Sequence, residues 1–372
     1  MKNTMLALRG GWTLTAVVMA TATATAATSF SNTLRGFTGN STQAATRAAL
    51  AAAGFEVDVI TGAGNGPPPD LVPIDPTVLF DAQGATFGGL LPADGGRNYI
   101  RTIQSDYATT SFTSEITIVT LDMETQDVYF GLGAGVTVPT AFFTPDWTTQ
   151  TSSVMYWGES ENIGLADPPP TLDVFRTQNN VGLDVYTPIP DLPFDGTHRL
   201  RIDFDRYART FTLGFDVNYN GTFAADVTTP PMDVSSLYGP TGWNSEPSRI
   251  FFGGDDAIII KDFQVTTTGA AAKDGDFTGD GLITSADWVI LRNNLHKDIS
   301  SGTHQQAYFL GDLTGDKKND HADFVRFKAY FDAANGVGAF TAMLASVPEP
   351  SSLALTAAAG LALLAAARSK RD

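Results

Sequence analysis

Two stretches of this sequence place oxygen-bearing side chains at a regular spacing, and the first begins at Asp276. A calcium loop of the EF-hand type takes oxygen ligands from positions 1, 3, 5, 7, 9 and 12 and turns sharply at position 6. Gly281 stands at position 6, where glycine tolerates a positive φ. The predicted ligands are Asp276, Thr278, Asp280, the carbonyl of Leu282, Thr284 (directly or through water) and Asp287.

The same spacing recurs from Asp312, which is 36 residues after Asp276 (312 minus 276). Here Lys317 stands at position 6, and a lysine at positive φ costs roughly 1 kcal/mol, so this second loop should be weaker or distorted. The predicted ligands are Asp312, Thr314, Asp316, the carbonyl of Lys318, Asp320 and Asp323. The duplication favours two Ca²⁺ sites over a pair of acidic turns.

An apolar stripe follows each loop. Its members are spaced i, i+3, i+7, which predicts one buried face on each of two helices. They are Trp288, Leu291 and Leu295 after the first loop, and Phe324, Phe327 and Phe331 after the second. Two loop–helix units are therefore expected to share one small core.

Residues 274–337, with two calcium loops each followed by a helix, resemble a type I dockerin. The resemblance implies a module that folds around calcium and docks onto a cohesin-like partner through positions 10 and 11 of each loop. Those positions hold Ser285-Ala286 and His321-Ala322, which do not form the symmetric Ser-Thr pair of many cellulosomal dockerins. Docking is therefore less strongly indicated than calcium binding.

A third stretch, residues 216–227, begins in calcium-loop register with Asp216, Asn218 and Asn220. Position 12 is Val227, so the final carboxylate is absent, and Asn220-Gly221 is a common hairpin signal. The stretch is predicted to be a turn between strands.

Residues 28–268 read as one main domain that opens with a short helix at 42–53. Beyond it, short runs alternate apolar and polar residues, as where Leu200, Ile202 and Phe204 alternate with charged neighbours. Period-two alternation between Gly, Pro and Asp turns predicts half-buried antiparallel strands in a mainly β sandwich. The segments "FDGTHRLRIDFDRYARTFTLGFDVNYNG", "VLFDAQGATFGG" and "DAIIIKDFQV" resemble core strands of the concanavalin A-like, laminin-G-type jelly roll. That family includes glycan-binding modules, glycoside hydrolases and polysaccharide lyases, so its fold does not select among them.

No catalytic residues are predicted. The paired-carboxylate strand motif of jelly-roll glucanases is absent, as are the nucleophile elbow, the P-loop and the dinucleotide fingerprint. Two acidic pairs, Asp122 with Glu124 and Glu159 with Glu161, are interpreted as solvated strand edges. Five aromatic residues lie in or beside loop-like stretches: Trp147, Tyr156, Trp157, Tyr238 and Trp243. Each is more often a core or loop packing residue than a ligand platform, but as a group they slightly favour glycan recognition over a bare scaffold.

The two ends of the chain are expected to be targeting signals. Lys2 and Arg9, an apolar stretch and alternating small residues up to Ala26 are typical of a secretory signal peptide. At the other end, Val347-Pro348-Glu349-Pro350-Ser351, a short apolar helix and a basic tip resemble the PEP-CTERM sorting signal, also called the ice-binding protein C-terminal domain. That resemblance implies an exosortase-type sorting enzyme and a transient transmembrane helix. An ordinary tail anchor is the alternative.

The composition narrows the classes of partner. A net charge of −17 disfavours nucleic acid, and the absence of cysteine excludes disulfides and thiolate zinc sites. The sequence therefore predicts an exported, surface- or matrix-sorted protein that binds a polysaccharide or matrix component. A divergent polysaccharide-degrading enzyme and a structural matrix protein are the alternatives.

The expected organisation has seven parts. They are a signal peptide (1–27), an N-terminal segment of the main domain (28–72), a jelly roll (73–268), a linker (269–273), a dockerin-like calcium module (274–337), a linker (338–346) and a sorting signal with a short membrane helix (347–372).

Overall fold

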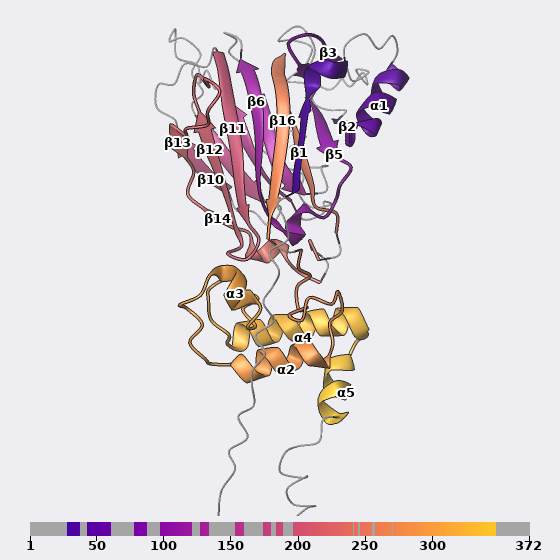
Figure 1. The fold of residues 1–372 in the computed structure, drawn as a ribbon, viewed down its shortest axis with the longest axis vertical. Coiled ribbons are helices and arrows are strands. Elements are labelled where there is room, and N and C mark those ends of the chain that lie inside the picture. Colours follow the sequence, from indigo (N-terminus) through magenta and orange to yellow (C-terminus); the bar gives the residue numbers. More distant parts are fainter. Residues whose placement is uncertain are drawn as a thin grey trace, which may run out of the picture.

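A computed structural model shows a β-sandwich with a small helical module at one end (Figure 1). It describes residues 28–37, 43–60, 78–87, 97–120, 127–133, 153–159, 174–179, 184–188, 196–254 except 241 and 245, 257–269 and 271–346. Both predicted targeting signals lie outside these ranges. Within them, no helix is long and apolar enough to cross a membrane.

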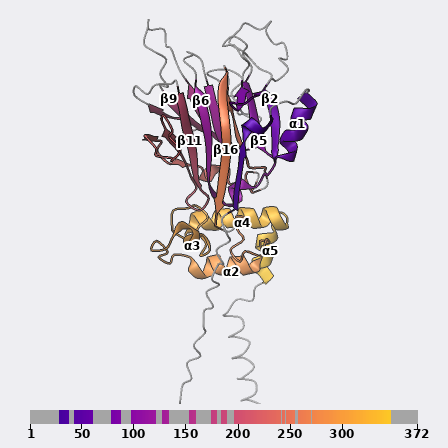
Figure 2. The same ribbon diagram turned by 45° about the horizontal axis from the view of Figure 1, so that its top comes forward.

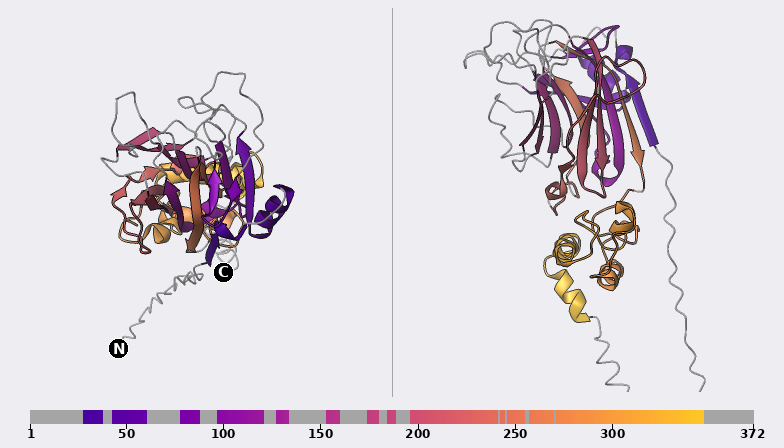
Figure 3. Two further views of the ribbon diagram at one scale, coloured as in Figure 1. Left: turned by 90° about the horizontal axis from the view of Figure 1, so that it is seen from above. Right: turned by 90° about the vertical axis from the view of Figure 1, so that its left-hand side faces the viewer.

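The described strands form two antiparallel sheets that face each other (Figure 3, right). The nine-stranded sheet contains β1 (Thr28–Thr33), β3 (Leu79–Phe80), β4 (Ala85–Phe87), β6 (Ser111–Thr120), β11 (Gly196–Asp205), β12 (Thr210–Asp216), β13 (Val227–Thr228), β14 (Met232–Asp233) and β16 (Ile258–Thr268). The seven-stranded sheet contains β2 (Phe55–Ile60), β5 (Arg97–Thr102), β7 (Asp127–Gly133), β8 (Ser153–Glu159), β9 (Val174–Asn179), β10 (Asp184–Pro188) and β15 (Arg249–Gly254). The predicted mainly β, two-sheet sandwich is confirmed.

The core of the sandwich is aromatic and aliphatic. On β11, Leu200 and Ile202 are buried, as their alternation with charged residues predicts. Two ring pairs stack across the sheets with centroids 5.0 Å apart, namely Phe252 with Phe263 and Tyr156 with Phe211. Burial of one such side chain contributes about 1.5–3 kcal/mol, so these pairs help fix how the sheets pack.

Helix α1 (Gln43–Ala52) lies at one edge of the sandwich, beside β2. Its Leu50 is fully buried in the core, and the chain leaves the helix through Gly54 at φ 90°. The helix predicted at 42–53 is confirmed. Short 3₁₀ helices lie at η1 (Leu34–Phe37), η3 (Tyr107–Thr109) and η5 (Ser235–Leu237).

The helical module has its own core. It contains α2 (Ser285–Asn294), α3 (His304–Tyr308), α4 (His321–Asn335) and α5 (Ala339–Ser346). Leu291 and Phe327 are fully buried, so the two predicted apolar stripes do meet in one core. The linker expected at 338–346 is instead largely helix α5, because Phe340 inserts among the aromatic rings of this core and is 1% exposed.

The helical module lies at one end of the sandwich (Figures 1 and 2). A buried charge cluster fixes it there to the tip of the β11–β12 hairpin. Nη2 of Arg206 donates to Oδ1 of Asp274 at 2.7 Å. Nη2 of Arg209 donates to both oxygens of the same carboxylate, at 2.8 and 2.9 Å. All three side chains are at most 1% exposed, so each charge depends on the others for compensation.

Further contacts surround this cluster. The guanidinium of Arg209 lies 3.7 Å from the ring centroid of Tyr238, and the hydroxyl of Tyr330 donates to the carbonyl of Tyr238 at 2.7 Å. Burial alone would raise the pKa of Asp274, but the charges of Arg209 and Arg206 outweigh it and hold that pKa below its usual value. The carboxylate therefore stays ionised between the two arginines.

The cluster predicts a large effect of Asp274→Ala on stability. The substitution leaves two buried guanidinium groups without their carboxylate, which costs about 3–5 kcal/mol. Thermal unfolding of the full chain should show a clearly lower midpoint. Asp298→Ala is the matched control, because Asp298 is exposed on the same module and its carboxylate accepts from the nearby N–H and hydroxyl of Ser300. Equal unfolding temperatures for the two variants would contradict the role of the cluster.

Candidate functional site

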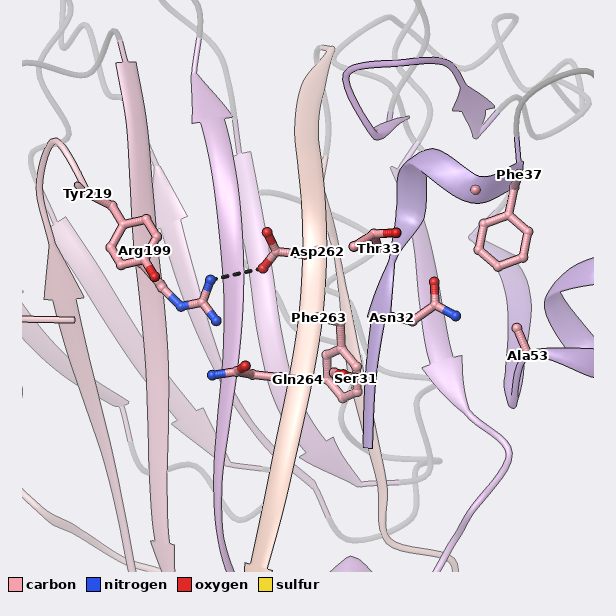
Figure 4. A pocket seen from close by; sticks show the side chains of 11 residues that line it. Ser31, Asn32, Thr33, Phe37, Ala53, Arg199, Tyr219, Asp262, Phe263 and Gln264 are labelled. Carbon is pink, nitrogen blue, oxygen red and sulfur yellow. Dashed lines mark hydrogen bonds and ion pairs between the residues drawn. The ribbon is translucent and has the colours of Figure 1, made fainter. Parts of the chain in front are cut away.

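A polar groove of about 750 Å³ lies on the outer face of the nine-stranded sheet (Figure 4). Its walls come from β1, η1, β11, β16, the end of α1 and the turn that follows β12. The lining residues are Ser31, Asn32, Thr33, Gly36, Phe37, Ala53, Arg199, Tyr219, Asp262, Phe263 and Gln264.

Arg199 is the charged centre of the groove. Strand register aligns it with Thr117 on β6, which pairs in turn with Asp262 on β16. Nε of Arg199 donates to Oε2 of Glu115 at 2.7 Å, and its Nη1 donates to Oδ1 of Asp262 at 2.9 Å. Nη1 also donates to the hydroxyl of Thr117. The guanidinium is thus held in one orientation by groups from two neighbouring strands.

The electrostatics of this network keep Arg199 charged. Burial would lower the pKa of the guanidinium, but the hydrogen bond and the negative charge of Glu115, together with Asp262, raise it above its ordinary value. The side chains of Arg199 and Glu115 are only 7% and 9% exposed. The positive charge is therefore balanced locally and attracts little additional negative charge.

Several polar atoms of the network remain available to a ligand. Among the described residues, Nη2 of Arg199 and Oδ2 of Asp262 have no hydrogen-bond partner. Gln264 uses its amide nitrogen to contact Glu115, which leaves Oε1 without a partner in the same part of the chain. The groove thus offers fixed donors and acceptors side by side, which suits a ligand rich in hydroxyl groups.

Tyr219 supplies an aromatic surface beside this network. The guanidinium of Arg199 lies 5.0 Å from the centroid of its ring. The turn that carries Tyr219 is closed by carboxylates, because Asp226 accepts from the N–H of Val217 at 2.8 Å and Asp216 accepts from that of Ala224 at 2.7 Å. Residues 216–227 therefore form the predicted turn, which joins two antiparallel strands.

His198 fixes the base of this turn. The imidazole is fully buried, and its Nδ1 accepts from the N–H of Asn218 at 3.2 Å. Because Nδ1 accepts, the ring proton lies on Nε2, which is 3.1 Å from the hydroxyl of Thr120. Asn218 itself has φ 56°, a left-handed conformation that asparagine tolerates. The histidine thus stabilises a backbone shape that places Tyr219 over the groove.

Three of the five aromatic residues considered as sugar platforms lie in the core. Tyr156, Tyr238 and Trp243 are 1%, 4% and 3% exposed and pack in the core, which confirms the packing role expected for each of them and leaves the three unsuited to be sugar platforms. Trp157 lies on β8 in register with Tyr129, and Trp147 is outside the described residues. Of the acidic pairs, Glu159 ends β8, and the other members (Asp122, Glu124, Glu161) are outside the described residues.

In the first predicted calcium loop, carboxylates accept backbone N–H groups. Asp276 accepts from Gly281, which has the expected positive φ of 84°, at 2.6 Å. Asp287 is fully buried, accepts from Phe277 at 2.8 Å and forms a capping box with Thr284 at the start of α2. Asp280 donates its backbone N–H to Asp276 at 3.2 Å, and its carboxylate accepts from the N–H of Leu282, the predicted carbonyl ligand, at 2.9 Å. Thr278 donates its hydroxyl to Asp276 at 3.1 Å.

The second loop brings three carboxylates around Thr314. The threonine hydroxyl lies 3.3 Å from Asp312 and 3.1 Å from Asp316, and its N–H donates to Asp323 at 3.0 Å. Burial, assisted by the charge of Asp312, raises the pKa of Asp323 to about 6. Burial likewise raises the pKa of Asp312. This loop therefore concentrates negative charge that a cation would compensate.

The other predicted ligands of the second loop interact with neighbouring residues of the loop and of α4. Lys317 has the positive φ expected at position 6, at 60°. Nζ of Lys318 pairs with Asp316 at 3.4 Å, and Asp320 caps α4 by accepting from Ala322 at 2.8 Å. Asp320 is therefore engaged in helix capping.

The two loops offer the type of ligand atom that calcium prefers, but their side chains are not arranged around a common point. Every predicted ligand is an oxygen, which Ca²⁺ prefers. Over the ranges that the structure describes, however, no three His, Asp or Glu side chains are arranged to hold a metal ion. Calcium binding stays a prediction.

The comparisons with known proteins give only a loose similarity. No protein-family model matches this sequence, and no curated protein sequence matches it. Winged bean acidic lectin complexed with methyl-α-D-galactose is 10% identical, with a TM-score of 0.39, over 65% of this chain and 98% of that one. Peanut lectin with a 9mer peptide is 14% identical, with a TM-score of 0.38, over 66% and 99%. The Crh5 transglycosylase in complex with NAG is 11% identical, with a TM-score of 0.36, over 68% and 90%. The dockerin and PEP-CTERM resemblances receive no support from these comparisons.

The groove itself was not predicted. Glu115 lies 84 residues before Arg199, and Asp262 lies 63 residues after it. Each is an outward-facing polar residue on a different strand. The available signal was the charged alternation around Arg199, but only the strand order shows which residues it meets.

Replacing His198 should loosen the turn that carries Tyr219. His198→Phe keeps a ring beside Phe215 but removes the acceptor for the N–H of Asn218, and a hydrogen bond contributes about 0.5–1.5 kcal/mol to stability. Hydrogen exchange should therefore accelerate at Asn218 and Tyr219, by roughly tenfold for each 1.4 kcal/mol. The amide of Thr212, inside β12, serves as an internal control. Unchanged exchange in the turn would refute this role of His198.

Proposed function

We propose that this protein binds a neutral glycan, from a polysaccharide or an extracellular matrix component, in the polar groove without cleaving it. The observation that supports this is the guanidinium of Arg199, which Glu115 and Asp262 hold in place beside the ring of Tyr219. Fixed hydrogen-bonding groups beside an aromatic ring are the usual elements of a selective ligand site. In this arrangement the ring supplies contact area and Nη2 of Arg199 supplies directed hydrogen bonds.

The charge of the groove favours a neutral ligand. Arg199 is already paired with two carboxylates, so the groove offers no uncompensated positive charge to an acidic sugar. The chain as a whole carries −17, which repels sulfated or uronic polymers. Hydrogen bonds and ring contacts should therefore dominate, and binding should persist at moderate salt.

The same carboxylates argue against hydrolysis in this groove. A glycosidase needs one carboxyl group that carries a proton and a second that is free to attack or to activate water. Glu115 and Asp262 both accept hydrogen bonds from the guanidinium of Arg199, so these two carboxyl groups are engaged in the network and neither is free for such a role. Binding without cleavage is therefore the better-supported function.

The proposal extends to the fold type of the sandwich and to the localisation of the protein. We propose that the sandwich is of the concanavalin A-like, laminin-G type, on the strength of the local sequence resemblances. We also propose export and exosortase-type sorting to the surface or matrix, which the terminal signals in the sequence support. Docking of a cohesin-like partner is part of the same proposal and is supported by the dockerin resemblance of the sequence.

Tyr219→Ala tests the groove directly. An aromatic contact contributes about 0.5–1.5 kcal/mol, so the variant should lose roughly three- to tenfold in affinity for a neutral polysaccharide. Affinity electrophoresis through gels containing neutral glucans, xylans or galactans would measure this. Thr222→Ala, an exposed substitution in the same turn that lies outside the groove, is the control. Failure of the wild-type chain to bind across the panel would overturn the proposal, and new reducing ends would favour an enzyme instead.

We also propose that the two loops of the helical module bind Ca²⁺ and that the ion stabilises the module. Calcium at one hundred times its dissociation constant adds about 2.7 kcal/mol to the stability of a folded state that alone binds it. Thermal unfolding with millimolar calcium should shift upward relative to unfolding with chelator. Asp276→Ala and Asp287→Ala should each reduce this shift more than Thr278→Ala, because they remove charged ligands. The shift in Asp298→Ala should equal that of the wild type, and no calcium response in the wild type would exclude the sites.

A further inference from the structure

A second arginine–aromatic stack lies next to the groove. The guanidinium of Arg201 is 5.2 Å from the centroid of the Phe223 ring, much as Arg199 stacks on Tyr219. Both arginines project from the outer face of β11 and are two residues apart, which corresponds to roughly 7 Å along a strand. Both aromatic rings come from the single turn between β12 and β13. The turn therefore carries two similar platforms along one line.

A glycine on the neighbouring strand β12 leaves space for the ring of Phe223. A Cβ atom at Gly214 would lie 2.9 Å from Cζ of Phe223, so the absence of a side chain at Gly214 makes room for the ring. Arg201 is itself fixed, because its Nε donates to Oδ1 of Asp203 at 3.1 Å. Phe223 remains partly exposed. The second platform is thus held in place and accessible.

We propose that the groove continues past Tyr219 to a second subsite formed by Phe223 and Arg201. Its ligand is then a neutral oligosaccharide chain, with adjacent sugar rings over Tyr219 and Phe223, and not a single terminal sugar. This inference rests on the proposed function, because it requires that the first subsite binds glycan. Since hydrogen bonds close the turn that carries both rings before binding, a second sugar ring gains contact with little ordering of the protein.

Chain-length dependence is the property that distinguishes two subsites from one. The probes are cello-, xylo- and laminari-oligosaccharides from the monosaccharide to the hexasaccharide, titrated calorimetrically into the full chain. For a sugar that binds, affinity should rise by roughly three- to tenfold from the monosaccharide to the disaccharide, as one more aromatic contact forms. Phe223→Ala should abolish this rise and leave the monosaccharide affinity unchanged.

Two further variants separate a subsite from a packing role. Phe223→Leu keeps an apolar group over Gly214 but removes the flat ring, so it should also abolish the rise while retaining the thermal stability of the wild type. Thr222→Ala, next to Phe223 and exposed, should keep the wild-type profile. Tyr219→Ala should weaken binding at every chain length.

The possible failures point to different parts of the argument. Equal affinity for monosaccharide and disaccharide in the wild type, or an unchanged rise in both Phe223 variants, would overturn the second subsite and leave glycan binding intact. No binding of any probe at any length, nor of the polymers, would overturn the proposed function and the second subsite with it.

Discussion

One buried carboxylate, that of Asp274, joins the two halves of this molecule. It lies between two guanidinium groups that the β11–β12 hairpin delivers, and all three charges are removed from water. Such a cluster is stable only when each partner is in place, because an unpaired charge in the interior is strongly unfavourable. The segment between β16 and the first acidic loop is fixed as well, since the carbonyl of Ala272 accepts from Arg206 at 2.7 Å. The sandwich and the helical module therefore behave as one folded body.

The acidic loops have two possible uses for the same oxygens. A carboxylate that accepts N–H groups from its own loop keeps a tight turn and a helix start in place, and Asp276, Asp287 and Asp323 all do this. Calcium ligation requires some of those oxygens to face a common point. In the second loop, Asp312, Asp316 and Asp323 all bond to Thr314, and the turn contains a lysine in place of glycine.

The sequence predicted those features that depend on local pattern. Alternation around Leu200 indicated a half-buried strand, a stripe containing Phe327 indicated a core helix, and Asn220-Gly221 indicated a turn. The sequence did not predict the roles of residues whose contacts come from distant parts of the chain. Tyr238 looked like a loop aromatic, yet Arg209 from the hairpin and Tyr330 from α4 enclose it. Glu115, Arg199 and Asp262 form the groove only because β6 lies between β11 and β16, an order that no local pattern contains.

The two ends of the β11–β12 hairpin contact different parts of the molecule. Its tip is embedded in the helical module, and its open end continues into the turn that overhangs the groove (Figure 1). A strand as long as β12, with seven residues, spans roughly 23 Å, so the hairpin acts as a stiff spacer between the two ends. If the protein is attached through its helical end, the groove is held clear of the attachment surface. The distance between the groove and the helical module is then set by the paired strands of the hairpin.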